Sequence, residues 1–143
     1  MSKLPERLRE LMHEKGWNQS DLGKHADVQH TNISDFLSET HVPSYGNLIK
    51  LLYTLNCSAD YLMGTEDIHT EETLFPVLPF SQRLRDMLQT NGISQERLKR
   101  ELPVSGSVLY KWLSGKNLPT AESLLRLAEY FGCSIDFLLG RRR

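Results

Sequence analysis

A short polar run, QHTNISD at residues 29–35, holds the side chains of this sequence that are best suited to chemical recognition. It offers amide, imidazole, hydroxyl and carboxylate groups within about two turns of a helix. Such groups donate and accept the hydrogen bonds that base edges present in the major groove of DNA. The candidate recognition residues in this run are Gln29, His30, Thr31, Asn32 and Asp35.

Two short helices joined by a tight turn must position this run. Apolar residues at helical spacing predict the first helix over about 19–26 and the second over about 29–37. Asn18 is placed to cap the first helix, and Asp21 follows three residues on, as in a capping box. Gly23 falls where the two helices would cross, and a side chain there would push them apart. The polar side chains of the second helix then face outward.

The chain is a tandem repeat. An offset of 76 residues aligns residues 6–64 with residues 82–140 without a gap. The motif Arg7-Leu8-Arg9 falls on Arg83-Leu84-Arg85, and many leucines and turn residues also coincide. Two copies are too few for a solenoid, so we expect two separate globular domains.

The sequence pattern of each copy predicts five helices and no strand, so the expected fold class is all-α. In the first copy the predicted helices cover residues 4–14, 19–26, 29–37, 43–55 and 59–63. In the second copy they cover residues 80–91, 95–102, 105–113, 120–131 and 134–139. We therefore expect two five-helix domains and a linker, with boundaries at 1–66, 67–79 and 80–143.

The linker and the C-terminal tail each allow more than one interpretation. Residues 65–79 are acidic at the front and apolar at the back, with two prolines, which favours an extended chain. The apolar part, residues 74–78, is expected to pack against a domain or to join a contact between domains or chains. The tail Arg141-Arg142-Arg143 is either a mobile phosphate clamp or a solvated end.

The composition argues against several classes of function. The 143 residues carry a net charge of -1, and no apolar run approaches the roughly 20 residues of a membrane helix. No signal-peptide pattern opens the sequence, so a cytoplasmic location is expected. We find no catalytic motif and expect neither an enzyme nor a cofactor. Cys57 and Cys133 lack metal-ligand spacing and align in the repeat, which indicates small apolar core positions.

The complete pattern resembles the lambda-repressor-like, Cro-type (XRE) helix-turn-helix family, and it does so twice. The first copy matches at Gln19, Leu22 and Gly23, through the run 27–34, and at Val42-Pro43 before the fourth helix. The endings of both copies match at Ser58-Ala59-Asp60-Tyr61-Leu62-Met63-Gly64 and Ser134-Ile135-Asp136-Phe137-Leu138-Leu139-Gly140. The resemblance implies a sequence-specific regulator of transcription that binds double-stranded DNA, commonly as a dimer. Repression is the favoured direction, and no small-molecule effector is evident.

The resemblance also implies roles for individual residues. Gln19 is expected to contact a phosphate. The second helix is expected to contact base edges and, further along, phosphates, through Gln29, His30, Thr31, Asn32 and, at the margin, Asp35. In the second copy the corresponding DNA-binding residues are Gln95, Ser105, Ser107, Lys111 and Lys116.

Both copies depart from the family pattern. Lys99 occupies the small-residue position that Gly23 holds in the first copy, and Pro103 sits in the following turn. The two helices are therefore expected to pack differently in the second copy. Its outward surface, Ser-Gly-Ser-Val at 105–108, has little with which to read a base. In the first copy, Glu39 stands where the family usually has glycine.

The half with the better candidate surface for reading bases carries net negative charge, whereas the half with the poorer surface carries net positive charge. Residues 1–66 hold six Lys and Arg against nine Asp and Glu, a net charge of -3. Residues 80–143 hold eleven Lys and Arg against six Asp and Glu, a net charge of +5. Since phosphate attraction drives non-specific DNA affinity, the two halves need not contribute equally. The alternative to a DNA-binding regulator is a protein-interaction module, antirepressor-like or antitoxin-like, in which one or both copies no longer bind DNA.

Overall fold

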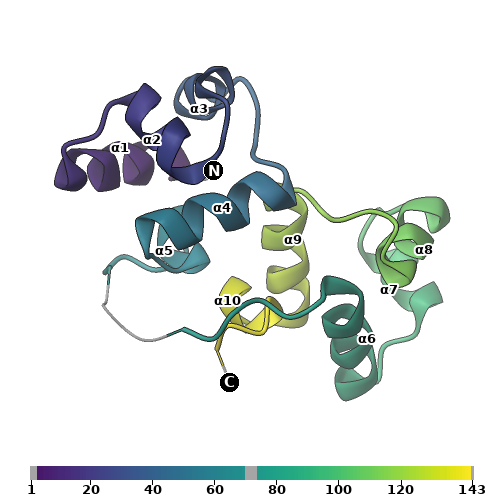
Figure 1. The fold of residues 1–143 in the computed structure, drawn as a ribbon. Helices are drawn as coiled ribbons and strands as arrows, with labels where there is room; N and C mark the ends of the chain where they lie inside the picture. The colour runs from purple at the N-terminus through teal and green to yellow at the C-terminus, as the bar shows by residue number, and fades with distance from the viewer. Residues whose placement is uncertain (1–2, 70–73, 143) are drawn as a thin grey trace. The chain divides into compact units, whose positions relative to one another are not determined.

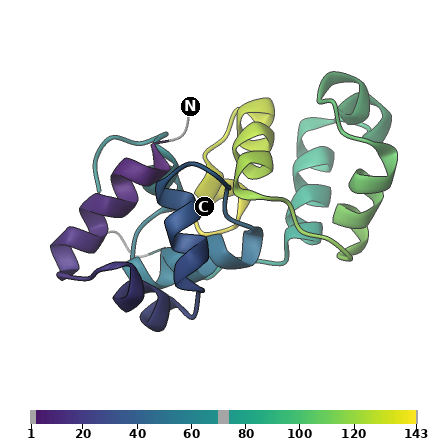
Figure 2. The same cartoon turned by 90° about the horizontal axis from the view of Figure 1, so that it is seen from above.

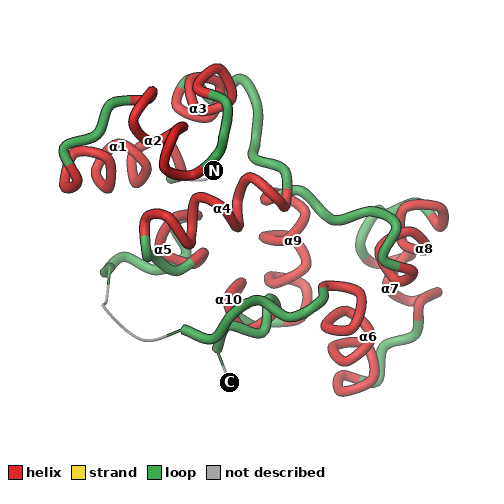
Figure 3. The backbone as a smooth tube through the Cα atoms, viewed as in Figure 1, coloured by secondary structure: helices red, strands yellow, loops and turns green. Residues whose placement is uncertain are grey.

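The structure is a computed structural model that describes residues 3–69 and 74–142. The chain divides into two compact units, unit 1 (Met1–Glu72) and unit 2 (Thr73–Arg143). Unit 1 holds, in order, α1 (Leu4–Lys15), α2 (Gln19–Ala26), α3 (His30–Leu37), α4 (Tyr45–Leu55) and α5 (Ala59–Met63) (Figure 1). Unit 2 holds α6 (Phe80–Asn91), α7 (Gln95–Glu101), α8 (Gly106–Ser114), α9 (Ala121–Phe131) and α10 (Ile135–Leu138). Over the described residues the predicted all-α fold is confirmed, with helices and loops only (Figure 3).

Helix starts follow the predicted caps. The Asn18 side chain accepts from the Asp21 N–H at 2.8 Å, and the Asp21 carboxylate accepts from the Asn18 N–H at 3.0 Å. This is the predicted capping box, and it satisfies two N–H groups that the first turn of α2 would otherwise leave unbonded. Ser58 and Thr120 also cap α5 and α9, each side chain accepting one main-chain N–H of the first turn.

Leucines form a separate core in each unit. The largest side chains that are almost fully buried in unit 1 are Leu8, Leu11, Leu22, Ile33, Leu48, Leu51, Leu52 and Leu62. Those in unit 2 are Leu84, Leu98, Leu109 and Leu124. In unit 1, α3 packs against α1 and α2, and in unit 2, α8 packs against α6 (Figure 2). The second helix of each predicted motif, α3 in unit 1 and α8 in unit 2, is called the recognition helix below and is part of a packed core rather than a free arm.

The two tryptophans differ in burial. Trp112 is 5% exposed and meets the Phe80 ring edge-on, with centroids 6.2 Å apart. Trp17 is half-buried and stacks on His25, with ring centroids 4.1 Å apart. Trp112 therefore belongs to the core of unit 2, whereas Trp17 covers the outer junction of α1 and α2.

The first arginine of each repeated Arg-Leu-Arg motif binds the C-terminal end of a distant helix. Arg7 donates to the carbonyls of Tyr61 at 3.1 Å and Glu66 at 2.9 Å. Arg83 donates to the carbonyl of Phe137 at 2.7 Å. Guanidinium groups suit this role because the last carbonyls of a helix have no partner within the helix and carry partial negative charge.

The apolar end of the predicted linker runs along the C-terminal segment of unit 2. The Phe75 N–H donates to the Arg141 carbonyl at 2.9 Å, and the Leu78 N–H donates to the Leu139 carbonyl at 3.0 Å. Leu78 also lies against Gly140, where a Cβ atom would come within 2.8 Å of the leucine side chain. These residues form an extended strap, residues 74–79, that closes unit 2.

The tail differs from both interpretations drawn from the sequence. Arg141 is 5% exposed, and its Nη1 lies 3.2 Å from a carboxylate oxygen of the fully buried Asp136. Its main-chain N–H also donates to the Asp136 carbonyl at 2.8 Å. Arg141 is therefore a core residue, neither a mobile clamp nor a solvated end, because a buried carboxylate holds it. Arg142 is half-buried, and Arg143 lies outside the described residues.

Candidate nucleic-acid interface

The turn between α2 and α3 fixes the start of the recognition helix. Asp27 adopts a left-handed conformation with φ 57°, and the Val28 N–H donates to the Gly23 carbonyl at 3.0 Å. Lys50 on α4 reaches this turn, donating to the Asp27 carbonyl at 3.0 Å and lying 3.6 Å from its carboxylate. The turn is thus held both by its own backbone and by a side chain from another helix.

Gly23 is required by the close approach of α2 to this turn. A Cβ atom at this position would lie 2.7 Å from the Val28 carbonyl oxygen and 3.5 Å from the His30 nitrogen. The first distance is shorter than real Cβ contacts allow, and the clashing partner is main chain that cannot move aside. The prediction that Gly23 lies at the helix crossing is confirmed.

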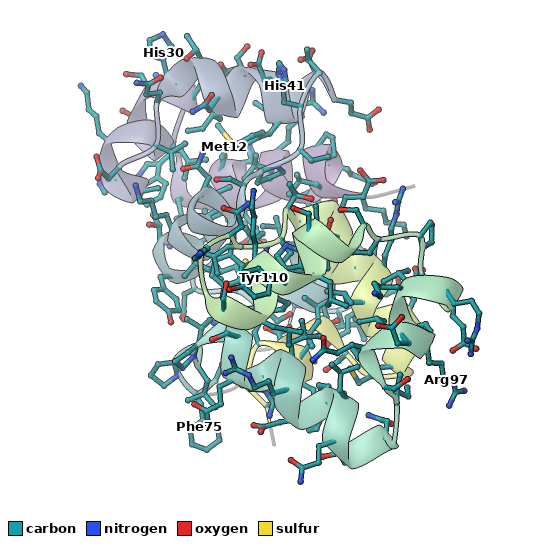
Figure 4. All side chains as sticks on the ribbon, turned by 90° about the vertical axis from the view of Figure 1, so that its right-hand side faces the viewer. Met12, His30, His41, Phe75, Arg97 and Tyr110 are labelled. Carbon is teal, nitrogen blue, oxygen red and sulfur yellow. The ribbon has the colours of Figure 1, made fainter. Side chains whose placement is uncertain are left out.

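The exposed start of α3 brings three of the candidate residues together. Gln29, predicted as the first helical residue, is instead the N-cap, and its side chain makes no capping bond. His30 and Thr31 follow in the first turn, and all three side chains are exposed. Figure 4 shows His30 pointing away from the body of its domain. Asn32 is half-buried beside them.

Asp35 is engaged within its own domain. One carboxylate oxygen lies 3.1 Å from His41 Nδ1, and its carbonyl accepts from the Thr40 N–H at 2.9 Å. These bonds shape the loop after α3, where Glu39 has a left-handed φ of 61°. The equivalent residue in unit 2 is Gly115, at φ 79°. The glycine that the family places in this loop therefore corresponds to a real conformational requirement.

A shallow hollow of about 240 Å³ lies between α2 and the start of α3. Its lining residues are Ser20, Gly23, Lys24, Val28, Gln29 and His30. Lys24 and Ser20 are exposed, so a cation and a hydroxyl lie beside the candidate residues Gln29 and His30. Gln19 is the exposed first residue of α2, next to the capping box. The groups along this edge of unit 1 suit a phosphate backbone, and the side chains at the start of α3 suit base edges.

The candidate residues of unit 2 lie at exposed positions but offer fewer free groups. Ser105, predicted inside the helix, is the N-cap of α8, and its hydroxyl oxygen accepts from the Val108 N–H at 3.1 Å. Lys116 lies over the exposed Tyr110 ring, 5.5 Å from its centroid. The remaining exposed candidates are Gln95, Ser107 and Lys111.

The turn of unit 2 is built differently, as the sequence predicts. Pro103 stands where Asp27 stands in unit 1, and the proline ring fixes φ near -65°, so the left-handed turn cannot form. α7 ends at Glu101, Leu102 is extended with φ -113°, and the Val104 N–H donates to the Leu102 carbonyl at 2.6 Å. With this altered turn, unit 2 accommodates Lys99 at the position where unit 1 has Gly23.

A cleft of about 190 Å³ opens beside this altered turn. Its lining residues are Leu102, Pro103, Val104, Ser105, Val108, Trp112, Ser123 and Arg126. Arg126 is equivalent to Lys50, but it pairs with Glu122 at 2.8 Å instead of reaching the turn. Arg126 therefore does not form in unit 2 the hydrogen bond that Lys50 of α4 donates to the Asp27 carbonyl in unit 1.

Sequence reasoning missed the residues that hold the recognition helices in place. Arg9 donates to the Leu37 carbonyl at the end of α3 at 3.0 Å, and Arg85 donates to the equivalent Leu113 carbonyl. Lys50 was missed as well. The repetition of Arg-Leu-Arg in both copies was the available signal, but main-chain carbonyl partners leave no pattern in a sequence.

Comparisons with known proteins agree with this geometry. A helix-turn-helix domain family model matches residues 6–68, and a second helix-turn-helix family model matches residues 84–138. Both halves of the chain therefore belong to the helix-turn-helix class, as two tandem copies. No helix among the described residues has the length and apolar character needed to cross a membrane.

One curated relative adds a more particular likeness. The HTH-type transcriptional activator BcrR of Enterococcus faecalis is 36% identical over 62 residues, which is 43% of this chain and 30% of that protein. The chain thus spans less than a third of the length of this relative. No solved structure matches the chain.

Proposed function

We propose that the chain is a sequence-specific, double-stranded DNA-binding regulator of transcription. The observation that carries this proposal is the exposed start of α3, where Gln29, His30 and Thr31 lie together on a helix fixed at both ends. In helix-turn-helix proteins the first residues of this helix contact base edges in the major groove. The likeness to a relative named as a transcriptional activator supports the same class of function.

The two units are proposed to divide the work of binding. Unit 1 supplies the richer set of base-reading groups, with Gln19 on a phosphate and Asn32 near the backbone. Unit 2 carries the positive charge, so Gln95, Lys111 and Lys116 are assigned to phosphate contacts that anchor the complex. We propose residues 1–66 and 80–143 as the two binding modules, acting as a covalent pair or within a homodimer.

Repression remains the predicted direction of regulation. A protein that occupies a promoter without contacting polymerase blocks it, and both matched segments of this chain are helix-turn-helix domains of the kind that occupy DNA. The relative is named as an activator, and it is more than three times as long as the matched segment. A promoter–reporter assay with the chain present and absent decides the direction.

The charge of unit 1 favours a second candidate function, a protein-interaction module. Its net charge of -3 over residues 1–66 opposes the approach of DNA. Val42 and Tyr53 are also about half exposed, which leaves apolar surface available for a partner. Under this proposal DNA affinity would be weak or confined to unit 2.

A DNA duplex that the full chain enriches from a random library is first selected and labelled with a fluorophore. The fluorescence anisotropy of this duplex, measured as the full chain is added, then tests both candidates. A regulator should show affinity that falls steeply with salt and a preference for the selected duplex over a scrambled one. Replacing His30, Thr31 and Asn32 by alanine should remove that preference and leave the helical circular dichroism spectrum unchanged. An unchanged preference would contradict the assignment to α3, and no affinity even at low salt would leave the interaction module as the better account.

A further inference from the structure

Two pairs of equivalent residues have exchanged large and small side chains between the units. Unit 1 has Gly23 on its first motif helix and His30 at the start of its recognition helix. Unit 2 has Lys99 and Gly106 at these positions. A large side chain at the exposed start of the recognition helix can therefore come from that helix itself, as in unit 1, or from the first motif helix, as in unit 2.

The geometry of unit 2 shows which side chain takes that space. A Cβ atom built on Gly106 would lie 3.7 Å from Lys99 Cδ and 3.8 Å from Lys99 Nζ. The end of the lysine therefore lies in van der Waals contact with the point from which the side chain of residue 106 would begin. In unit 1 the equivalent point is the root of the exposed His30 side chain. Lys99 thus carries its ammonium group to the place from which unit 1 presents its imidazole.

The environment of Lys99 leaves this ammonium group accessible. Its side chain is 33% exposed, and its ion partner is Glu96, at 3.0 Å, whose side chain is 80% exposed. An ion pair in which one side chain is so exposed contributes little stability, so a competing acceptor can displace it. The neighbouring side chains on α8 are small, since Ser105, Gly106 and Ser107 precede Val108.

The chemistry of the group indicates what it would bind. A lysine ammonium has three N–H donors and no acceptor. In the major groove, guanine presents two adjacent acceptors, N7 and O6, and lysine contacts to them are among the common specific contacts. Adenine instead pairs an acceptor with a donor, and thymine adds a methyl group.

We propose that Lys99, on the first helix of the second motif, is the base-reading residue of unit 2 and selects guanine. This inference rests on the proposed DNA-binding function and is an alternative to the expectation that unit 2 has little with which to read a base. Because the side chains at the start of α8 are small, they leave room for both α8 and the Lys99 side chain to approach the major groove.

Substitution of 7-deazaguanine tests the proposal on the full-length chain. A duplex selected from a random library by the wild-type chain is remade with each guanine replaced, one at a time, by 7-deazaguanine, which lacks only the N7 acceptor. At one position the replacement should weaken wild-type binding by about tenfold. Lys99→Met should bind the natural duplex more weakly, and 7-deazaguanine at that position should not weaken its binding further. Lys99→Arg should still bind the 7-deazaguanine duplex more weakly than the natural one.

Arg100→Met is the matched control, because it removes one positive charge from the same helix. It should keep the 7-deazaguanine effect at every position where wild type shows it. A thermal melt that matches wild type excludes unfolding of Lys99→Met, and Lys99→Arg provides the comparison if that variant is destabilised.

Other results would overturn the proposal. If Lys99→Met binds every duplex more weakly by the same factor, with a shallower salt dependence and unchanged 7-deazaguanine effects, Lys99 contacts a phosphate instead. If no duplex is enriched by the wild-type chain, the proposed function fails and this inference fails with it. If enrichment succeeds but no guanine depends on Lys99, this inference alone is wrong.

Discussion

Arg9 on α1 donates a hydrogen bond of 3.0 Å to the carbonyl of Leu37, the last residue of the recognition helix α3. Arg85 repeats this bond to Leu113 in unit 2. The contact joins residues that are 28 positions apart and satisfies a carbonyl that the helix itself leaves without a partner. The repeated motif therefore has a structural role in fixing the orientation of each recognition helix.

Replacing Arg9 by methionine should loosen α3. We expect the free energy of opening α3 to fall by about 1–2 kcal/mol, because the bond has a charged donor but is only partly buried. Native-state hydrogen exchange of the α3 amides measures this change. Glu14→Gln, which alters an exposed charge on the same helix, should change the value by less than about 0.5 kcal/mol. Equal effects of the two substitutions would refute the positioning role.

Gly23→Ala should destabilise unit 1 through a clash. The added methyl group would lie 2.7 Å from the Val28 carbonyl oxygen, so α2 and the turn must separate. A cost of about 1–3 kcal/mol is expected in urea denaturation, as for other overpacked sites. Gly46→Ala in α4 is the control, since no atom lies within 4 Å of its added methyl group. It should be neutral or stabilising by up to about 1 kcal/mol, because alanine favours helix.

Glu39→Gly should stabilise unit 1. The residue has φ 61°, a conformation that costs roughly 1–2 kcal/mol for a residue with a Cβ atom. Gly115 already occupies the equivalent position in unit 2. Glu39→Ala removes the same charge but keeps the Cβ atom, so it should give little of the gain in thermal stability. A gain that alanine reproduces fully would show that charge, not backbone strain, is responsible.

Arg141→Met should destabilise unit 2 strongly. It would leave the carboxylate of Asp136, which has no exposed surface, without its guanidinium partner. Loss of one member of a buried pair costs about 3–5 kcal/mol. Arg142→Met removes an identical charge from a half-buried position and should cost much less. Hydrogen exchange of the α9 amides distinguishes the two, and similar protection in both variants would place Arg141 outside the core.

The titration of Tyr45 gives a pH-dependent prediction. Burial, with a smaller contribution from the charge of Tyr53, raises the pKa of Tyr45 from 10.0 to about 12. Because the fold favours the neutral phenol, this contribution to stability is fully present below pH 10 and is lost as the pH rises toward 12. Tyr45→Phe should remove a late step from the ultraviolet titration of the phenolates. Removal of an early step near pH 10 would contradict the assignment.

Local features of the sequence predicted most of the fold. The capping box at Asn18 and Asp21, the close approach at Gly23 and the leucine stripes all follow from residues within a few positions of one another. The bonds of Arg9 and Arg141 do not follow in this way. Arg9 binds main-chain carbonyl oxygen, which every residue carries, and Arg141 binds a carboxylate that a terminal run of arginines does not reveal.

The candidate site could be proposed from sequence on the first copy, whereas the proposed role of Lys99 in the second copy required the structure. In unit 1 the candidate residues lie consecutively at the N-cap and first turn of α3, so a polar run in the sequence was enough to propose them. In unit 2 the side chain that reaches the start of α8 comes from the preceding helix α7, and the contact is visible only in three dimensions. The family pattern assigns reading residues by position on the recognition helix, so it passes over Lys99.

The exchange of side chains between the units has a consequence for the symmetry of the target. A homodimer of one helix-turn-helix domain presents the same surface twice, so each mutation alters both half-sites and a palindrome is maintained. Here the two surfaces are encoded separately, with an imidazole in one and an ammonium group in the other. Each can change without the other, so under the proposed function the target sequence need not have two related halves.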